Sequence, residues 1–376
     1  MRLATDLDRV PLGNGPTPVR ELTGLRSQGG VAPVWIKDDG LYSSLGGNKA
    51  RKLEWLLADA RRRRRRTILT GGAFGTNHGL ATAIFAGRLG MRTVLVLVPQ
   101  PETEHVRAQL QRLRDSGAEI HVAPGFWSSF ALAARLAVIR GGPGLRPPYF
   151  VPPGGSSPLG CVGYVRAAFE LAEQVAAGEL PEPSHVVVAL GSGGTAAGLL
   201  AGLRLSGLRS RLLCVLVSDV IRMNARSVAR LARRTLRLLN AHGTTRAADP
   251  LQGTLRVEPR WLGRGYGHST PAAERAMSLL AEREGVALDP VYTAKAMAAI
   301  LDLNEAGAFG DGPVLYWHTY SAPKANPIGR EAEERRDPAA PGREAEERRD
   351  PAAPGREAEE RRDPAAPGRE AEEAAG

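Results

Sequence analysis

Short apolar runs alternate along this chain with longer segments in which apolar residues recur every three or four positions. The runs predict β-strands at 34–36, 67–70, 93–98, 119–123, 185–190, 212–218 and 314–317. The periodic segments predict helices at 48–65, 77–89, 104–116, 160–177, 195–205, 220–241, 271–283 and 292–306. Continuous apolar strands between helices are typical of parallel sheets covered on both faces, so the pattern predicts an α/β protein.

The pattern changes near the end of the chain. A thirteen-residue unit rich in Glu, Arg, Ala and Pro begins at Gly329 and repeats at Gly342 and Gly355, with a truncated copy from Gly368. The unit has no apolar face to bury and is too short for a solenoid repeat. We therefore expect residues 329–376 to form a disordered or weakly helical extension, and the repeat specifies no partner.

The composition is that of a soluble enzyme. A chain of 376 residues with 43% hydrophobic content can bury a substantial core, and it contains no apolar run long enough to span a membrane. Its first residues do not resemble a secretory leader. The two cysteines, Cys161 and Cys214, lie in apolar or glycine-rich surroundings, where free buried thiols are expected. These features favour the reducing cytoplasm and give no metal-binding cluster.

The net charge of +10 raises the question of whether the protein binds a nucleic acid or a membrane surface. Its most concentrated element is the run of six arginines from Arg61 to Arg66, which ends a predicted helix. Cations at a helix C-terminus interact favourably with the helix dipole, so a solvated helix end explains the run better than a binding patch. We therefore expect neither a nucleic acid nor a membrane as partner.

Lys49 has unusual surroundings. It is one of only five lysines, and it follows Gly46, Gly47 and Asn48 where a helix is predicted to begin. Glycines allow the backbone to approach a ligand closely, and the positive end of a helix dipole favours the neutral amine. A neutral, partly desolvated lysine amine is the group that forms Schiff bases. A solvated lysine at a helix start is the alternative, and it would be favoured if Lys49 stood alone.

A second glycine-rich segment follows the predicted strand at 185–190. Residues 191–195 read Gly-Ser-Gly-Gly-Thr and lead into an Ala/Leu-rich helix. Backbone N–H groups of such a loop can bind a phosphate, and the hydroxyls of Ser192 and Thr195 add donors. The loop is neither a P-loop nor a dinucleotide fingerprint. Alternatively, it is a turn that packs a helix against a strand, and the loop alone does not decide between these roles.

Together these motifs resemble the D-cysteine desulfhydrase and 1-aminocyclopropane-1-carboxylate deaminase family of pyridoxal-phosphate enzymes, which have the fold of the tryptophan synthase β-subunit. Residues 35–60 are similar to the start of that family. Further similar segments follow in the family's order at 71–78, 154–164, 191–195 and 289–296. The resemblance covers about residues 10–320, and five motifs in order are much more specific than one.

The resemblance implies a two-lobed fold, a homodimer and pyridoxal 5'-phosphate as cofactor. The large lobe would comprise residues 1–54 and 161–328, and the small lobe residues 55–160. Lys49 would form the Schiff base and then act as general base, and Asn77 would bind the 3-oxygen of the cofactor. The phosphate would be held by Gly191, Ser192, Gly193, Gly194 and Thr195.

The resemblance also places residues around the substrate. Tyr266, Tyr292 and Thr76 would be catalytic residues: the tyrosines would face the substrate, and Thr76 keeps a hydroxyl in the segment that binds its carboxylate. Core tyrosines are the alternative for the pair. Thr293 would face the pyridine nitrogen, where a hydroxyl makes a weaker electron sink than a carboxylate. That favours the desulfhydrase branch over the cyclopropane branch, although Thr293 also suits a helix start.

Three departures from the family concern the substrate pocket. Gly75 and Thr76 stand where the family usually has Gln-Ser, and Leu80 stands where it has an arginine. Tyr320 and Ser321 replace two glycines and are expected to add bulk near the cofactor.

We therefore expect a pyridoxal-phosphate-dependent lyase or deaminase that acts on a small amino acid, most like D-cysteine desulfhydrase, which forms pyruvate, ammonia and sulfide. The alternatives are 1-aminocyclopropane-1-carboxylate deaminase, another amino-acid lyase, and a non-catalytic cofactor-binding or basic interaction protein.

Overall fold

A computed structural model describes residues 3–28, 32–45, 47–140, 146–244 and 254–320. Up to residue 320 these residues belong to one compact unit. The predicted tail at 329–376 lies outside the described residues, as do Gly46 and Ser321.

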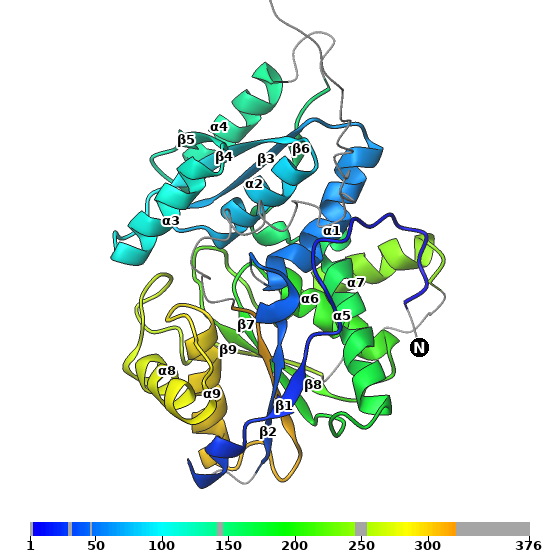
Figure 1. Ribbon diagram of the computed structural model, residues 1–376, viewed down its shortest axis with the longest axis vertical. Helices are drawn as coiled ribbons and strands as arrows, with labels where there is room; N and C mark the ends of the chain where they lie inside the picture. The colour runs from blue at the N-terminus through cyan, green and yellow to red at the C-terminus, as the bar shows by residue number, and fades with distance from the viewer. Residues whose placement is uncertain (1–2, 29–31, 46, 141–145, 245–253, 321–376) are drawn as a thin grey trace, which may run out of the picture. The chain divides into compact units, whose positions relative to one another are not determined.

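The described residues form two sheets (Figure 1). The larger sheet has six strands in the order β1 (Val19–Glu21), β2 (Val34–Asp38), β10 (Val314–His318), β7 (His185–Leu190), β8 (Arg211–Leu216) and β9 (Leu255–Glu258). Strand β1 runs antiparallel to β2, and the other neighbours are parallel. This arrangement confirms the predicted α/β class.

Successive side chains of the central strand β7 point to opposite faces of this sheet, and helices cover both faces. Val186 and Val188 pack into a core with helices α5 (Pro158–Ala176), α6 (Gly194–Leu205) and α7 (Ala225–Ala241). Val187 points the other way, into a core with α8 (Pro271–Glu284) and α9 (Thr293–Glu305). Figure 1 shows these two helical layers on opposite sides of the strands. Since both faces are buried, the positions of β7 from Val186 to Leu190 are all apolar.

The smaller sheet is parallel, with the strand order β5 (Glu119–Val122), β4 (Arg92–Val98), β3 (Thr67–Ala73) and β6 (Tyr149–Phe150). Leu95 and Leu97 face helices α2 (Asn77–Arg88) and α3 (Glu104–Asp115). Val94 and Val96 face helix α4 (Phe126–Ile139). All these elements lie inside the segment 55–160 expected to form the small lobe, and the lobe boundaries themselves remain a prediction.

Helix α1 (Gly47–Arg62) packs against both α5, which covers the larger sheet, and α2, which covers the smaller one. Most of its residues are buried, including Ala50, Leu53 and Leu57. Three short 3₁₀ helices complete the described elements: η1 (Thr23–Gln28), η2 (Asp39–Tyr42) and η3 (Pro153–Gly155). The placement of α1 fixes the start of the helix, and hence Lys49, relative to the loops of both sheets.

Several boundaries differ from the sequence prediction. The helix predicted from residue 220 begins at Ala225, because the Asn224 side chain caps it by accepting a hydrogen bond from Ser227 N at 2.9 Å. Strands β1, β6 and β9 and helix α4 were not predicted. The three strands contain only two to four residues, too few to establish a period.

The other sequence expectations that the structure addresses concern bulk features. Cys161 and Cys214 are free and buried, as predicted. At the arginine run, Arg62 and Arg63 pair with Asp59, and their side chains are 62% and 55% exposed. Within the described ranges, no helix combines the length and the apolar character needed to cross a bilayer.

Candidate active site

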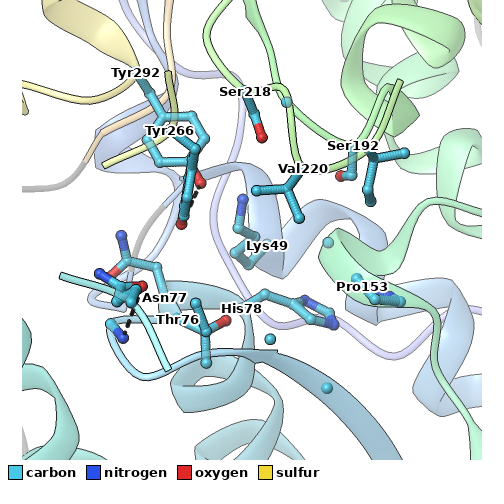
Figure 2. A pocket seen from close by; sticks show the side chains of 18 of the residues that line it. Lys49, Thr76, Asn77, His78, Pro153, Ser192, Ser218, Val220, Tyr266 and Tyr292 are labelled. Atoms are coloured by element: carbon cyan, nitrogen blue, oxygen red, sulfur yellow. Dashed lines mark hydrogen bonds between the residues drawn. The ribbon is translucent and has the colours of Figure 1, made fainter. Parts of the chain in front are cut away.

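A pocket with a volume of about 590 Å³ opens where strands of both sheets end. Its walls come from the segments that follow the carboxyl ends of β3, β4, β7 and β8, together with the start of α1. In parallel α/β sheets this is the edge at which ligands bind. Figure 2 shows side chains from these segments converging on one space.

Lys49 lies in the first turn of α1, and its side chain points into this pocket (Figure 2). The side chain is half-buried, and no described residue forms a hydrogen bond with its amine. Desolvation lowers the pKa of the Lys49 amine to about 8, although the negative charge of Asp289 opposes this shift. A large fraction of the amine is therefore neutral near pH 8, as a nucleophile or base requires.

Lys52 is a second amine beside the site, and the sequence did not single it out. It is 2% exposed, and its Nζ donates to Gly154 O at 3.1 Å. Burial, and then the charge of Lys49, lower the pKa of Lys52 to about 7. The spacing gave a usable hint, because residues three apart lie on the same face of a helix.

The loop at 191–195 forms a backbone cradle at the start of α6. Gly193 adopts φ +85° as the N-cap residue and makes no side-chain cap hydrogen bond. Side chains rarely adopt this backbone conformation, so the position favours glycine. Ser156 Oγ accepts from Gly194 N at 3.0 Å and lies 2.8 Å from Ser192 Oγ. N–H donors, hydroxyls and the positive end of a helix thus converge, which is the chemistry that a phosphate requires.

Lys52 lies next to this loop, because the glycine to which it donates, Gly154, packs against Ser192. A Cβ at Gly154 would lie 2.1 Å from Ser192 Oγ, so the carbonyl that binds Lys52 belongs to a residue packed directly against the loop. The pocket therefore places one amine, Lys49, in the open space and a second, Lys52, next to the phosphate-compatible loop.

The start of α2 forms the opposite wall. Thr76 caps the helix, since its Oγ1 accepts from Gly79 N at 3.1 Å. Asn77 is exposed to the pocket, and its Oδ1 accepts from Gln109 Nε2 at 2.9 Å. Because this oxygen is engaged, the NH₂ group is the part of the Asn77 amide that remains for a ligand.

His78 lies behind that wall and is 4% exposed. Burial, and then the charges of Lys49 and Lys52, hold its pKa well below the usual value. Its Nε2 shares a hydrogen bond with Thr70 Oγ1 at 3.2 Å. His78 is therefore neutral at physiological pH and adds no positive charge to the pocket.

Tyr266 and Tyr292 come from different segments and meet at the pocket (Figure 2). Tyr292 OH donates to Tyr266 OH at 3.0 Å, and the two rings meet edge to face at 75°. Burial raises the pKa of both hydroxyls, so both are protonated at neutral pH. Since Tyr266 accepts this hydrogen bond, its own proton is available to a ligand.

Thr293 is 1% exposed and does not line the pocket, whereas Asp289 does. The Thr293 hydroxyl donates to Asp289 Oδ2 at 2.6 Å and accepts from Asp289 N at 2.8 Å. Backbone N–H groups of Val291, Tyr292 and Thr293 also donate to the Asp289 carboxylate. Asp289 thus organises the start of α9, and the sequence offered only its place in a family-like segment as a hint.

The departures from the family pattern also line the pocket. Next to Gly75, the Gln100 side chain fills the adjacent space: its Oε1 accepts from Gly75 N at 3.3 Å, and a Cβ at Gly75 would lie 3.0 Å from its Nε2. Leu80 contributes an apolar surface, and Tyr320 adds a half-buried ring. The substrate end of the pocket therefore has its own composition.

Comparison with known proteins agrees with this geometry. A family model described as pyridoxal-phosphate dependent enzyme matches residues 10–319. D-cysteine desulfhydrases of Salmonella choleraesuis (strain SC-B67) and Salmonella paratyphi C (strain RKS4594) are each 37% identical over 328 residues, which cover 85% of this chain and 95% of each relative.

Solved structures are similar as well. The crystal structure of an ACC deaminase homologue is 32% identical, with a TM-score of 0.71, over 84% of this chain and 92% of that one. The structure of O-ureido-L-serine synthase is 18% identical with a TM-score of 0.56, over 83% of this chain and 90% of that one, and supports the fold alone.

Proposed function

Because this chain belongs to the family of pyridoxal-phosphate-dependent enzymes, we propose that it is a D-cysteine desulfhydrase, which releases pyruvate, ammonia and sulfide from a small amino acid. The observation that carries the proposal is the Lys49 amine, which has no hydrogen-bond partner among the described residues and a pKa lowered to about 8, in a pocket that also contains a phosphate-compatible loop. Family membership makes the chain an enzyme, so a non-catalytic binding protein is not retained.

The residues around the pocket fit the cofactor. The loop from Gly191 to Thr195 would hold the phosphate, with the Gly194 N–H exchanging its bond to Ser156 Oγ for one to the phosphate and Lys52 beside the loop as a further donor. Lys49 would bind the cofactor covalently, and the NH₂ group of Asn77 would donate to its 3-oxygen. When bound, pyridoxal phosphate withdraws electrons from the α-carbon of an attached amino acid.

The chain's own groups supply the remaining chemistry. The start of α2, with the Thr76 hydroxyl and the positive end of the helix, suits the substrate carboxylate. The Lys49 amine, once it is free, can accept the α-proton at Nζ. The Tyr266 proton, which is not given to Tyr292, can be donated to the departing sulfur. These three roles together amount to an elimination with an acid and a base on separate residues.

Deamination of 1-aminocyclopropane-1-carboxylate is the second candidate, favoured by the similarity to the ACC deaminase homologue. Residue 293 bears on the choice, because Thr293 carries no charge with which to keep a pyridine nitrogen protonated. Its hydroxyl proton is also engaged by Asp289 at 2.6 Å. A weak electron sink suits elimination of a good leaving group, which supports the desulfhydrase.

The deciding experiment supplies the purified, cofactor-loaded protein with D-cysteine, L-cysteine and 1-aminocyclopropane-1-carboxylate in parallel. We expect pyruvate and sulfide from D-cysteine, at a kcat/KM well above that for the other two. Formation of 2-oxobutanoate from the cyclopropane acid alone would transfer the assignment to the deaminase. A protein that binds the cofactor but converts none of the three would overturn both assignments.

We also propose that the protein is a cytoplasmic homodimer. The free, buried thiols of Cys161 and Cys214 support a reducing compartment. Sedimentation of the purified protein at twice the monomer mass would support the dimer, and a single monomer peak would exclude it.

A further inference from the structure

One wall of the pocket is built from nitrogen donors, and of these the proposed chemistry uses only Asn77. It consists of Asn77 at the start of α2, Gln100 after β4, and Gln109 and Arg112 on α3, all of which line the pocket. The acidic residues among the described lining, Asp219 and Asp289, come from segments of the other sheet.

Arg112 is the charged member of this wall. Its side chain is half-buried, and no ion pair links it to a carboxylate within the described ranges. Its Nη1 donates to Gln109 Oε1 at 3.4 Å, a long hydrogen bond that leaves most of its N–H groups available. A guanidinium that faces a pocket and is paired with no described carboxylate can bind an anionic ligand there.

The neighbouring amides are oriented by the same contacts. Because Gln109 Oε1 accepts from Arg112, Gln109 Nε2 faces Asn77 and donates to its Oδ1 at 2.9 Å. Gln109 is 2% exposed, so this orientation is fixed by packing. Gln100 Oε1 is likewise engaged, by Gly75 N at 3.3 Å. With the NH₂ group of Asn77 assigned to the cofactor, the donors on this wall that remain for a substrate are the NH₂ group of Gln100 and the Arg112 N–H groups other than the one bonded to Gln109.

Resting on the proposed function, we propose that this wall is a subsite for an oxyanion carried on the β-carbon of the substrate, with Arg112 as the specificity-determining residue. An array of N–H donors around a guanidinium matches a phosphate or sulfate ester and does not match a neutral substituent. The preferred substrate class is therefore amino acids whose β-carbon carries a phosphate or sulfate ester.

The reaction on such a substrate balances without a further reactant. For O-phosphoserine, the α-proton passes to Lys49 Nζ, and the Cβ–O bond breaks with both electrons leaving on phosphate. One water is then consumed as the remaining three-carbon unit yields pyruvate and ammonia. The subsite binds the group that departs, so its charge favours both binding and departure.

The test uses the cofactor-loaded protein and measures the binding of β-substituted serines, while turnover of D-cysteine is measured separately. Titration calorimetry compares both enantiomers of O-phosphoserine and of O-sulfoserine with serine, in the wild type, Arg112→Met and Arg112→Lys. Arg107→Met is the matched control, since Arg107 lies on the same helix, is 71% exposed and does not line the pocket. The two esters distinguish a phosphate preference from a general oxyanion preference.

We expect one enantiomer of each ester to bind the wild type about ten- to a hundredfold more tightly than serine. Arg112→Met should reduce this ratio to about one, Arg112→Lys should keep part of it, and Arg107→Met should keep all of it. Equal binding of esters and serine by the wild type would overturn the proposal. So would equal weakening of both ligands by Arg112→Met, because Arg112 would then bind the carboxylate that all these ligands share.

The outcomes separate this inference from the proposed function. If the protein turns over D-cysteine but binds the esters and serine equally well, the subsite proposal is wrong and the desulfhydrase proposal stands. If the protein is inactive toward D-cysteine but binds the esters more tightly than serine in a way that depends on Arg112, the desulfhydrase proposal is wrong and the subsite proposal stands.

Discussion

Helix α1 carries two basic side chains with different surroundings, two residues apart. Lys49 faces the pocket with a lowered pKa and no hydrogen bond from a described residue. Arg51 is 2% exposed and fully compensated: its Nε donates to Asp39 Oδ1 at 2.9 Å, and its Nη1 donates to Glu170 Oε2 at 3.0 Å. Burial alone would lower the pKa of Arg51, but Asp39 and Glu170 raise it above its usual value.

The compensation of Arg51 extends through a network. Lys37 Nζ also donates to Glu170, at 2.7 Å, and Tyr164 OH donates to Asp39 Oδ2 at 2.5 Å. Burial opposes ionisation of Glu170, yet Arg51 and Lys37 lower its pKa to about 2. The difference between the two regions is that one face of α1 satisfies its charges and fixes the helix, while the other leaves an amine unsatisfied and therefore reactive.

Removing the unsatisfied amine should produce the largest effect. Lys49→Ala is expected to reduce turnover of D-cysteine by at least about a thousandfold, because both the covalent attachment point and the base are lost. The free energy of unfolding should change by less than about 1 kcal/mol, since no hydrogen bond from a described residue is broken. Steady-state kinetics and urea denaturation measure the two quantities.

The second amine supplies the control for this assignment. After borohydride reduction, intact mass should show one covalent cofactor on the wild type and on Lys52→Met, and none on Lys49→Ala. Lys52 also has a lowered pKa, about 7, but its Nζ is bound to Gly154 O. An adduct on Lys49→Ala that is absent from Lys52→Met would exchange the roles of the two lysines.

Removing the buried, ion-paired Arg51 should mainly lower the stability of the protein. Arg51→Met leaves the Asp39 and Glu170 carboxylates without their main partner, so we expect a loss of about 3–5 kcal/mol in the free energy of unfolding. Arg62→Met on the same helix is the matched control, because Arg62 is 62% exposed and pairs at the surface with Asp59. Its cost should stay below about 1 kcal/mol. Similar costs for both variants would show that the buried network contributes no special stability.

The sequence allowed the reactive region to be predicted better than the compensated one. Lys49 and the loop at 191–195 lie in continuous segments whose glycines and helix starts can be recognised locally. The ion network joins Arg51 to Glu170 across 119 positions, and Lys37 to Glu170 across 133. No local pattern encodes such pairs, because the fold of α1, α5 and β2 is what brings them together.

Thr293 illustrates a different limit. The family-like segment assigned its hydroxyl to the cofactor, but a side chain's position in a motif does not give its hydrogen bonds. Here the hydroxyl is engaged by Asp289 on both its donor and its acceptor side. The role assigned to Thr293 stays a prediction, and it requires the hydroxyl to exchange its bond to Asp289 for one to the cofactor.

The smallest effect we expect is that of pH on the rate at which the cofactor attaches to Lys49. Since the pKa of Lys49 is lowered to about 8, the neutral amine is the minor form below pH 8 and the major form above it. The rate of covalent cofactor attachment should rise about tenfold per unit below pH 7, about fivefold between pH 7 and pH 8, and only about twofold between pH 8 and pH 9. Rapid mixing of the cofactor-free protein with pyridoxal phosphate, with trapped samples weighed by mass spectrometry, measures this rate.

The compensated region provides the internal reference for that titration. Arg51 remains charged across this range, because its pKa is raised, so circular dichroism should stay constant from pH 6 to pH 10 while the attachment rate changes. A rate that continues to rise tenfold per unit up to pH 10 would mean that the pocket does not desolvate Lys49. The two faces of α1 would then differ in their hydrogen bonds but not in the acidity of their cations, and the reactivity of Lys49 would have to come from its position alone.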